Sequence, residues 1–309
     1  MAVPYGFELV ALHYPFNQPK AIRITNIPED IENFGLFIQS QNINQAEIVT
    51  DNIEFLRDIT FLKHFRICPP MSTAKGYDFS PLYSIPEIVS LSCKNQYGTK
   101  AQYMSLIDYS QINGLVDLFV SVNKGTLNFN KIKSLRSLRI VGFKGKNRNL
   151  TDMFCSEELD TLQILQSGIT SLNGVSTSKK IQCLYLSHNR TLDDISALRH
   201  VSGTLKALRI SNCPRITDFS VLGELENIEL LELSGSNTLP NLKFLHSMKN
   251  LKTFIFNVNV LDGDLTPCLP LSYVNTSKNR KHYNLRNSEL PKNTYYHGNE
   301  NIEEWRRLE

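Results

Sequence analysis

Long apolar runs are missing from this 309-residue sequence. None approaches the roughly 20 apolar residues that a membrane span needs, so we expect no membrane partner. The amino terminus, MAVPYGFELVALHYPF, has no basic leader and no small-residue cleavage site, and Glu8, His13 and Pro15 interrupt its apolar residues. We therefore expect no secretory signal.

Paired cysteines and a strong charge of one sign are also absent. The six cysteines are scattered without a CxxC pair, which favours a reducing cytoplasm over a disulfide framework. The formal net charge is only +3, whereas nucleic-acid binders usually concentrate Lys and Arg on one face. We expect no nucleic-acid partner.

Motifs of the common enzyme classes are lacking as well. The chain has no HExxH, GxSxG or GxxxxGK[ST] pattern, and its seven histidines are scattered. No His–acid pair is placed in the sequence to activate Cys183 as a nucleophile. We predict no catalytic residue, no cofactor and no metal site.

An internal repeat is the main feature that is present. The clearest copy is Ile181-Gln-Cys-Leu184-Tyr-Leu186-Ser-His-Asn189, and the same frame returns at Leu205–Cys213 and Ile228–Leu233. Weaker copies occur on both sides. The central apolar position falls, at intervals of 20 to 27 residues, on Phe65, Leu91, Leu118, Leu138, Leu162, Leu184, Leu208, Leu231 and Phe254.

These residues resemble the leucine-rich repeat, LxxLxLxxN, in its short bacterial form. Asn123, Asn189 and Asn259 match the ninth position, while Cys213 and Ser236 are substitutes. The resemblance implies an α/β solenoid, or horseshoe, with a parallel concave β-sheet and short helical or 3-10 segments on the convex side. Each coil would cover the apolar side of its neighbour.

A second motif, D-h-S-x-h, lies between the strands. An Asp that accepts free backbone N–H groups would start a short helical turn there. This motif is similar to the convex segment of internalin-type repeats, so the resemblance implies a binding role and brings no catalytic residues. It occurs at Asp78–Leu82, Asp108–Ile112, Asp194–Leu198 and Asp218–Leu222.

The two ends depart from the repeat frame. We predict an amino-terminal α/β cap over residues 1–58, about nine repeats over 59–274, and a basic carboxy-terminal capping tail over 275–309 with a helix that carries Trp305. Residues 96–104 form a polar insertion. The alternatives are that residues 1–58 form an independent domain and that the tail is disordered.

The candidate partner-binding residues follow from strand alternation, because side chains beside the inward leucines face the concave side. The middle row should stand clear of the sheet, since the row before it is mostly small. Aromatic and Arg side chains dominate interface energetics. The candidates are Phe119, Arg139, Val141, Gln163, Leu165, Tyr185, Arg209 and Glu232.

Together these features predict a cytoplasmic, bacterial, monomeric and non-catalytic protein that binds a protein partner of unknown identity on its concave face. The alternative for this face is a solvated scaffold surface that contacts nothing. Two further alternatives are an enzyme with its site in residues 1–58 and an effector or surface protein exported by a non-classical route.

Overall fold

The computed structural model describes residues 8–12, 18–70, 77–93, 106–153 and 156–294. The predicted polar insertion and the Trp305 helix lie outside these residues. The chain forms two compact units, Met1–Leu138 and Arg139–Arg306, and the boundary falls within strand β9 (Ser137–Val141).

The first unit contains a sheet in the order β1-β2-β3-β4-β5-β7. β1 is antiparallel to β2, and each later pair is parallel. β6 and β8 form a separate parallel pair. The elements are β1 Glu8–Leu12, β2 Gln18–Ile24, α1 Ile31–Ser40, β3 Gln45–Ile48, η2 Glu54–Arg57, β4 His64–Ile67, η3 Ser80–Ser84, β5 Ser90–Cys93, β6 Ile107–Asp108, η4 Tyr109–Gln111, β7 Asp117–Ser121, β8 Thr126–Leu127 and η5 Phe129–Lys131.

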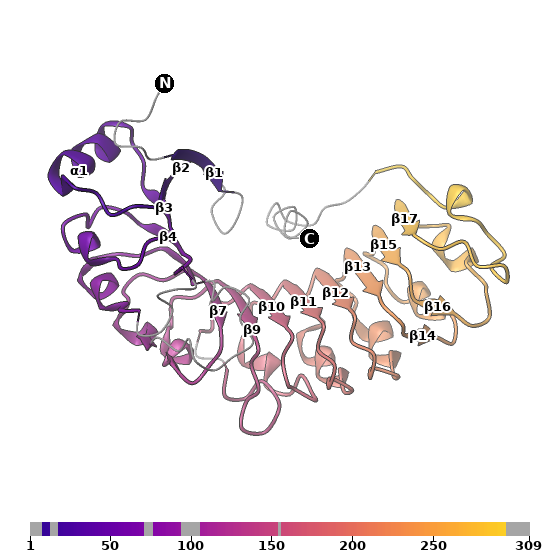
Figure 1. Ribbon diagram of the computed structural model, residues 1–309. Helices are drawn as coiled ribbons and strands as arrows, with labels where there is room; N and C mark the ends of the chain where they lie inside the picture. The colour runs from indigo at the N-terminus through magenta and orange to yellow at the C-terminus, as the bar shows by residue number, and fades with distance from the viewer. Residues whose placement is uncertain (1–7, 13–17, 71–76, 94–105, 154–155, 295–309) are drawn as a thin grey trace. The chain divides into compact units, whose positions relative to one another are not determined.

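The second unit repeats the same arrangement in the order β10-β11-β12-β13-β15-β17, with parallel neighbours throughout. Except for the last one, which lies beyond the edge strand β17, its 3-10 helices lie on one side of this sheet and leave the other side, here termed the open face, without helices among the described residues (Figure 1). The elements are β10 Thr161–Leu165, η6 Val175–Thr177, β11 Cys183–Ser187, η7 Ser196–Val201, β12 Ala207–Ser211, η8 Ser220–Glu224, β13 Leu230–Ser234, β14 Thr238–Leu239, η9 Lys243–His246, β15 Thr253–Phe256, β16 Asn259–Val260, η10 Thr266–Cys268, β17 Tyr273–Thr276 and η11 Asn287–Glu289.

The central apolar positions of the repeat stack in register. Leu184 pairs with Leu162 on one side and Leu208 on the other, and Leu208 pairs in turn with Leu231. All nine predicted central residues are buried, and full burial of such a side chain contributes about 2 kcal/mol. The predicted fold class, a leucine-rich-repeat solenoid, is therefore confirmed.

The register also extends to strands on both sides of the nine central positions. In the first unit, Ile22 pairs with Ala46, and Ala46 pairs with Phe65. In the second unit, Phe254 pairs with Val274. Strands β2 and β3 thus belong to the parallel sheet although they precede residue 58. The boundary at residue 58 between the amino-terminal cap and the repeats stays a prediction.

Buried amides join successive coils of the second unit. Asn189 is fully buried; its Oδ1 accepts from Ser167 N at 2.8 Å and its Nδ2 donates to Ile164 O at 2.9 Å. Asn237 Nδ2 donates to the carbonyl oxygens of Cys213 and Ile216. Such bonds satisfy backbone groups that would otherwise be buried without partners.

The residue predicted at the ninth position of the repeat is wrong in two coils. Ser236 was expected at the ninth position, but the adjacent Asn237 makes the inter-coil bonds. The Asn259 Oδ1 is buried without a hydrogen-bond partner among the described residues, whereas Asn257 Oδ1 accepts from Gly235 N at 2.7 Å. Both differences are shifts of one or two residues at an irregular turn.

The D-h-S motif forms the predicted turn. The Asp side chain accepts the backbone N–H two residues later, as in Asp194 to Ser196 and Asp218 to Ser220, both at 2.8 Å. The bond from the Ser220 backbone lowers the pKa of the Asp218 carboxyl. Because the carboxylate form is the better acceptor, the Asp218 turn is held best above the ordinary pKa of an aspartate, and this contribution is lost as the pH falls through the lowered pKa.

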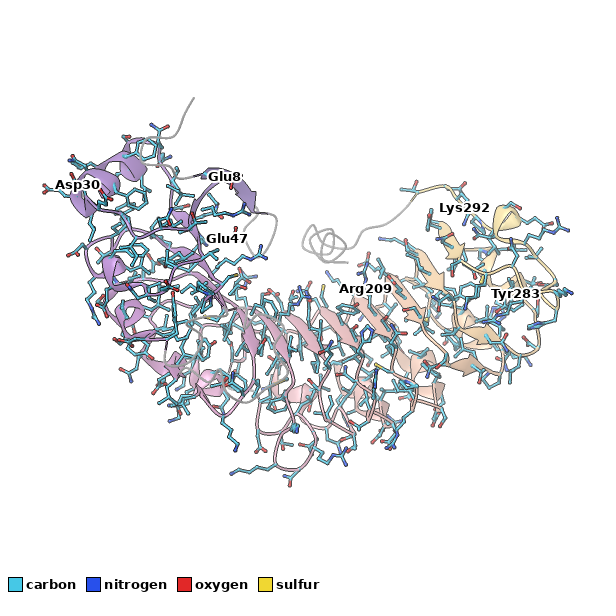
Figure 2. The ribbon with its side chains drawn as sticks, viewed as in Figure 1. Glu8, Asp30, Glu47, Arg209, Tyr283 and Lys292 are labelled. Atoms are coloured by element: carbon cyan, nitrogen blue, oxygen red, sulfur yellow. The ribbon has the colours of Figure 1, made fainter. Side chains whose placement is uncertain are left out.

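The carboxy-terminal residues to 294 pack over the last coil. Val274 N donates to Pro291 O at 2.9 Å, Asn293 N donates to Ser272 O at 3.1 Å, and Tyr273 and Lys292 form an antiparallel bridge. Tyr283, which lies in this segment (Figure 2), donates its hydroxyl to Val258 O at 3.2 Å. The described part of the tail, to residue 294, thus contacts the last coil, and its role as a cap stays a prediction.

We predict that Asn189→Ala lowers the free energy of unfolding by about 2–4 kcal/mol, because it leaves Ser167 N and Ile164 O buried without partners. Chemical denaturation monitored by circular dichroism measures this difference. Asn147→Ala is the matched control, since Asn147 is exposed, and it should leave the midpoint unchanged. Equal midpoints for the two variants would contradict the structural role of the Asn189 amide.

Candidate functional site

The predicted middle row occupies adjacent positions on the open face of the second unit. Gln163 on β10 pairs with Tyr185 on β11, which pairs with Arg209 on β12, and Arg209 pairs with Glu232 on β13. Figure 2 shows Arg209 pointing away from the interior of the solenoid. The register therefore brings four candidates together on four consecutive strands.

The remaining candidates lie nearby or in the other unit. Leu165 is on β10, beside Ser187 of β11. Arg139 and Val141 are on β9 at the start of the second unit. Phe119 lies on β7 of the first unit, beside Ser92, and is considered separately from the others.

Three of the candidates do not stand clear of the sheet, so that part of the prediction is wrong. Gln163 is 1% exposed, Arg209 3% and Tyr185 9%. The guanidinium carbon of Arg209 lies 5.9 Å from the Tyr185 ring centroid, and its Nε lies 3.3 Å from Glu232 Oε2. Arg209 is thus held between its two neighbours in the row.

Small side chains explain how Tyr185 is buried. Tyr185 forms an apolar cluster with Cys183, Ala207 and Leu230, which occupy the preceding row on β11, β12 and β13. The sequence shows that these residues are small or apolar. From this we expected the larger side chains of the middle row to be exposed above them. They instead provide the surface against which the Tyr185 ring packs.

The other candidates are more accessible than the three that are buried. In the second unit, Arg139, Val141, Leu165 and Glu232 are half-buried. Among the buried ones, Gln163 Nε2 has no hydrogen-bond partner within the described residues, and the ion-paired Arg209 Nε makes no hydrogen bond of good geometry there. Buried donors of this kind are costly in a folded protein.

A charge ladder on the first unit was missed by the sequence analysis. On neighbouring strands, Arg23 Nε lies 2.5 Å from Glu47 Oε2, and Glu47 Oε1 lies 3.3 Å from Arg66 Nε. Arg23 also pairs with Glu8 at 2.9 Å (Figure 2 labels Glu8 and Glu47). Apolar and charged residues alternate in Ala21-Ile-Arg-Ile and Ala46-Glu-Ile, which indicates that the charged side chains share one face. Both segments were assigned to the amino-terminal cap.

The thiols of the repeat are poor nucleophiles. Burial raises the pKa of Cys183 to about 12, that of Cys93 to about 12 and that of Cys213 to about 11. Since the thiolate is the reactive form, a raised pKa suppresses reactivity at neutral pH. The sequence prediction that Cys183 is not an activated nucleophile agrees with this environment.

A polar cluster of His64, Ser90 and Asp117 contains the three residue types of a hydrolytic triad, but in a different spatial order. His64 Nδ1 lies 3.1 Å from Ser90 Oγ, and Ser90 Oγ donates to Asp117 Oδ2 at 3.4 Å. In a hydrolytic triad the histidine lies between the serine and the acid, so that it can take the serine proton. Here the serine lies between the other two and is 2% exposed.

A groove of about 530 Å³ lies beside α1, in the region where the enzyme alternative places its site. Its carboxylates, Glu32 and Asp58, are exposed. Catalytic acids and bases are usually tuned by burial or close charges. Within the described residues no cluster of three metal-ligating side chains occurs, and no helix there has the length and apolar character of a membrane span.

The comparisons with known proteins agree with the fold. No family model matches the chain. A solved internalin of Listeria monocytogenes superposes with a TM-score of 0.55 at 18% identity, covering 81% of this chain and 71% of the internalin. The predicted resemblance to internalin-type repeats is thereby confirmed at the level of fold.

A curated relative from Trypanosoma equiperdum, named as a putative adenylate cyclase regulatory protein, is 27% identical over 180 residues. The match covers 48% of this chain and 26% of the relative. The chain therefore spans about a quarter of the length of the curated relative that it matches.

We predict that Glu232→Ala lowers the free energy of unfolding by about 3 kcal/mol, because it leaves the Arg209 charge buried without its carboxylate. The double variant Arg209→Met/Glu232→Leu should return close to the wild-type value, since apolar replacement of a buried pair is often neutral or better. A double-mutant cycle by denaturation measures both. Additive effects of the single substitutions would show that the pair is not coupled.

We also predict that iodoacetamide at about pH 8 labels none of Cys93, Cys183, Cys213 and Cys268 in the native protein, because raised pKa values keep these thiols protonated. Labelling should be complete in guanidinium chloride. Mass spectrometry of the digested protein gives the extent at each cysteine. Rapid native labelling of Cys183 would contradict the buried cluster.

Proposed function

We propose that the chain is a non-catalytic interaction module and that it binds a protein partner through the open face of its second unit. The observation that carries the proposal is the in-register row Gln163, Tyr185, Arg209 and Glu232 on β10 to β13. This row is fixed by packing and by an ion pair before any partner arrives, and side chains ordered in advance lose less entropy on binding.

The accessible side chains around this row have a composition that suits protein recognition. Val141 on β9 and Leu165 on β10 offer apolar area, Arg139 on β9 and Glu232 on β13 carry charge, and all four are half-buried. A mixture of apolar centre and charged rim is typical of protein interfaces. Phe119, on the first unit, is also half-buried.

The setting we propose is a reducing cytoplasm, with a bacterial source and a monomeric chain. The five cysteines within the described residues are free and buried, as expected of a protein that forms no disulfides. The relative from Trypanosoma carries a regulatory name, which supports a binding role. The second candidate function is an effector exported by a non-classical route.

Site-specific photocrosslinking tests the proposal. A benzoylphenylalanine at position 141 or 165, introduced in cells of the source organism, should capture a discrete protein partner. The control position is Lys243, which is exposed on the side of the sheet that carries η9. Equal capture from position 243 would argue against the open face as the binding surface.

Binding of the captured partner then tests individual side chains. We predict that Val141→Glu/Leu165→Glu weakens its affinity about tenfold or more, as the loss of interface contacts commonly does. Lys243→Glu should leave the affinity unchanged. Calorimetry on folded, purified variants measures the difference, and unchanged affinity for the double variant would overturn the proposal.

A further inference from the structure

A basic groove lies along one flank of the second unit, where strands β11, β12, β13 and β15 begin. It has a volume of about 660 Å³. Lys206, Glu229 and Lys252 in its lining are the residues immediately before β12, β13 and β15. The groove is therefore a different surface from the open face and does not depend on the function proposed for that face.

Five lysines and one carboxylate, that of Glu229, line this groove. Lys252 pairs with Glu229 at 2.7 Å, and Lys180 pairs with Glu158, outside the groove, at 2.6 Å. Lys179, Lys206 and Lys249 make no ion pair within the described part of the chain. A chain with a formal net charge of only +3 thus gathers unneutralised charge of one sign at one place.

The unpaired lysines come together because the coils stack, and not because these lysines are neighbours in the sequence. The three unpaired lysines lie on three different coils, ahead of β11, β12 and β15. Like charges that are brought together repel one another, and an anionic partner relieves this repulsion. The lysines therefore favour a ligand with several negative charges along its length.

The chemistry of the groove favours carboxylates on a protein segment. Its lining contains lysines but no arginine, and it contains no aromatic side chain. Bidentate phosphate recognition favours arginine, and single-stranded nucleic acids usually stack on aromatic rings. Four strands spaced by about 4.8 Å span roughly 14 Å, the length of about four extended residues.

We propose that the groove formed at the starts of β11, β12, β13 and β15 binds an extended acidic segment of a protein through Lys179, Lys206 and Lys249. The lysines act as point charges that pair with Asp and Glu side chains. Since exposed charges are screened by salt, binding weakens as ionic strength rises.

Fluorescence anisotropy with the full chain tests this assignment. The probe is a labelled peptide of alternating Asp and Glu, and the comparison probe has Asn and Gln at the same positions. The acidic peptide should bind at low salt, and Lys179→Glu/Lys249→Glu should weaken it about tenfold or more. The amide peptide should not bind.

The matched control variant is Lys146→Glu/Lys243→Glu, which makes the same change in net charge at two exposed lysines of the same unit outside the groove. It should keep the affinity within about twofold. Equal weakening by the two variants, or no binding of the acidic peptide, would overturn the proposal.

Labelled oligothymidylate is the third probe. Tighter binding of this probe than of the acidic peptide, lost in Lys179→Glu/Lys249→Glu and kept in the control, would assign the groove to nucleic acid and sink the acidic-segment proposal. All three probes leave the open face unchanged, so their outcome does not bear on Val141 or Leu165.

Discussion

The stacking of inward apolar side chains, coil upon coil, is the constraint on which everything else in this protein depends. Leu162, Leu184, Leu208 and Leu231 pair directly across neighbouring strands, and no single coil can bury its own leucine. Because side chains alternate along a strand, the same register fixes which residues lie on the open face. The surface chemistry of each unit is therefore a consequence of its core.

The sequence predicted those features that repeat with the coil. The nine central positions are all buried, and the Asp of each D-h-S motif accepts a backbone N–H where its turn begins. Both features are local, because a leucine needs only an inward strand position and an Asp needs only the next two residues. The membership of the open-face row followed for the same reason.

Features that arise between coils escaped prediction. Arg209 is buried because Tyr185 and Glu232 lie on either side of it, and neither contact has a signal within its own repeat. Strands β2 and β3 were expected in the amino-terminal cap and not in the repeat sheet, because alanine and isoleucine, in place of leucine, stand at the stacked positions Ala46 and Ile22. The basic groove was missed because its lysines come from three separate coils.

The folded-back segment before residue 294 has a consequence for assembly. A parallel strand at the end of a sheet normally offers unsatisfied N–H and C=O groups to any passing chain. On β17, Val274 N is bonded to Pro291 O and Thr276 N to Asn287 Oδ1. Another molecule would first have to displace this segment before it could extend the sheet at β17, so the segment shields this edge from pairing with a strand of another chain.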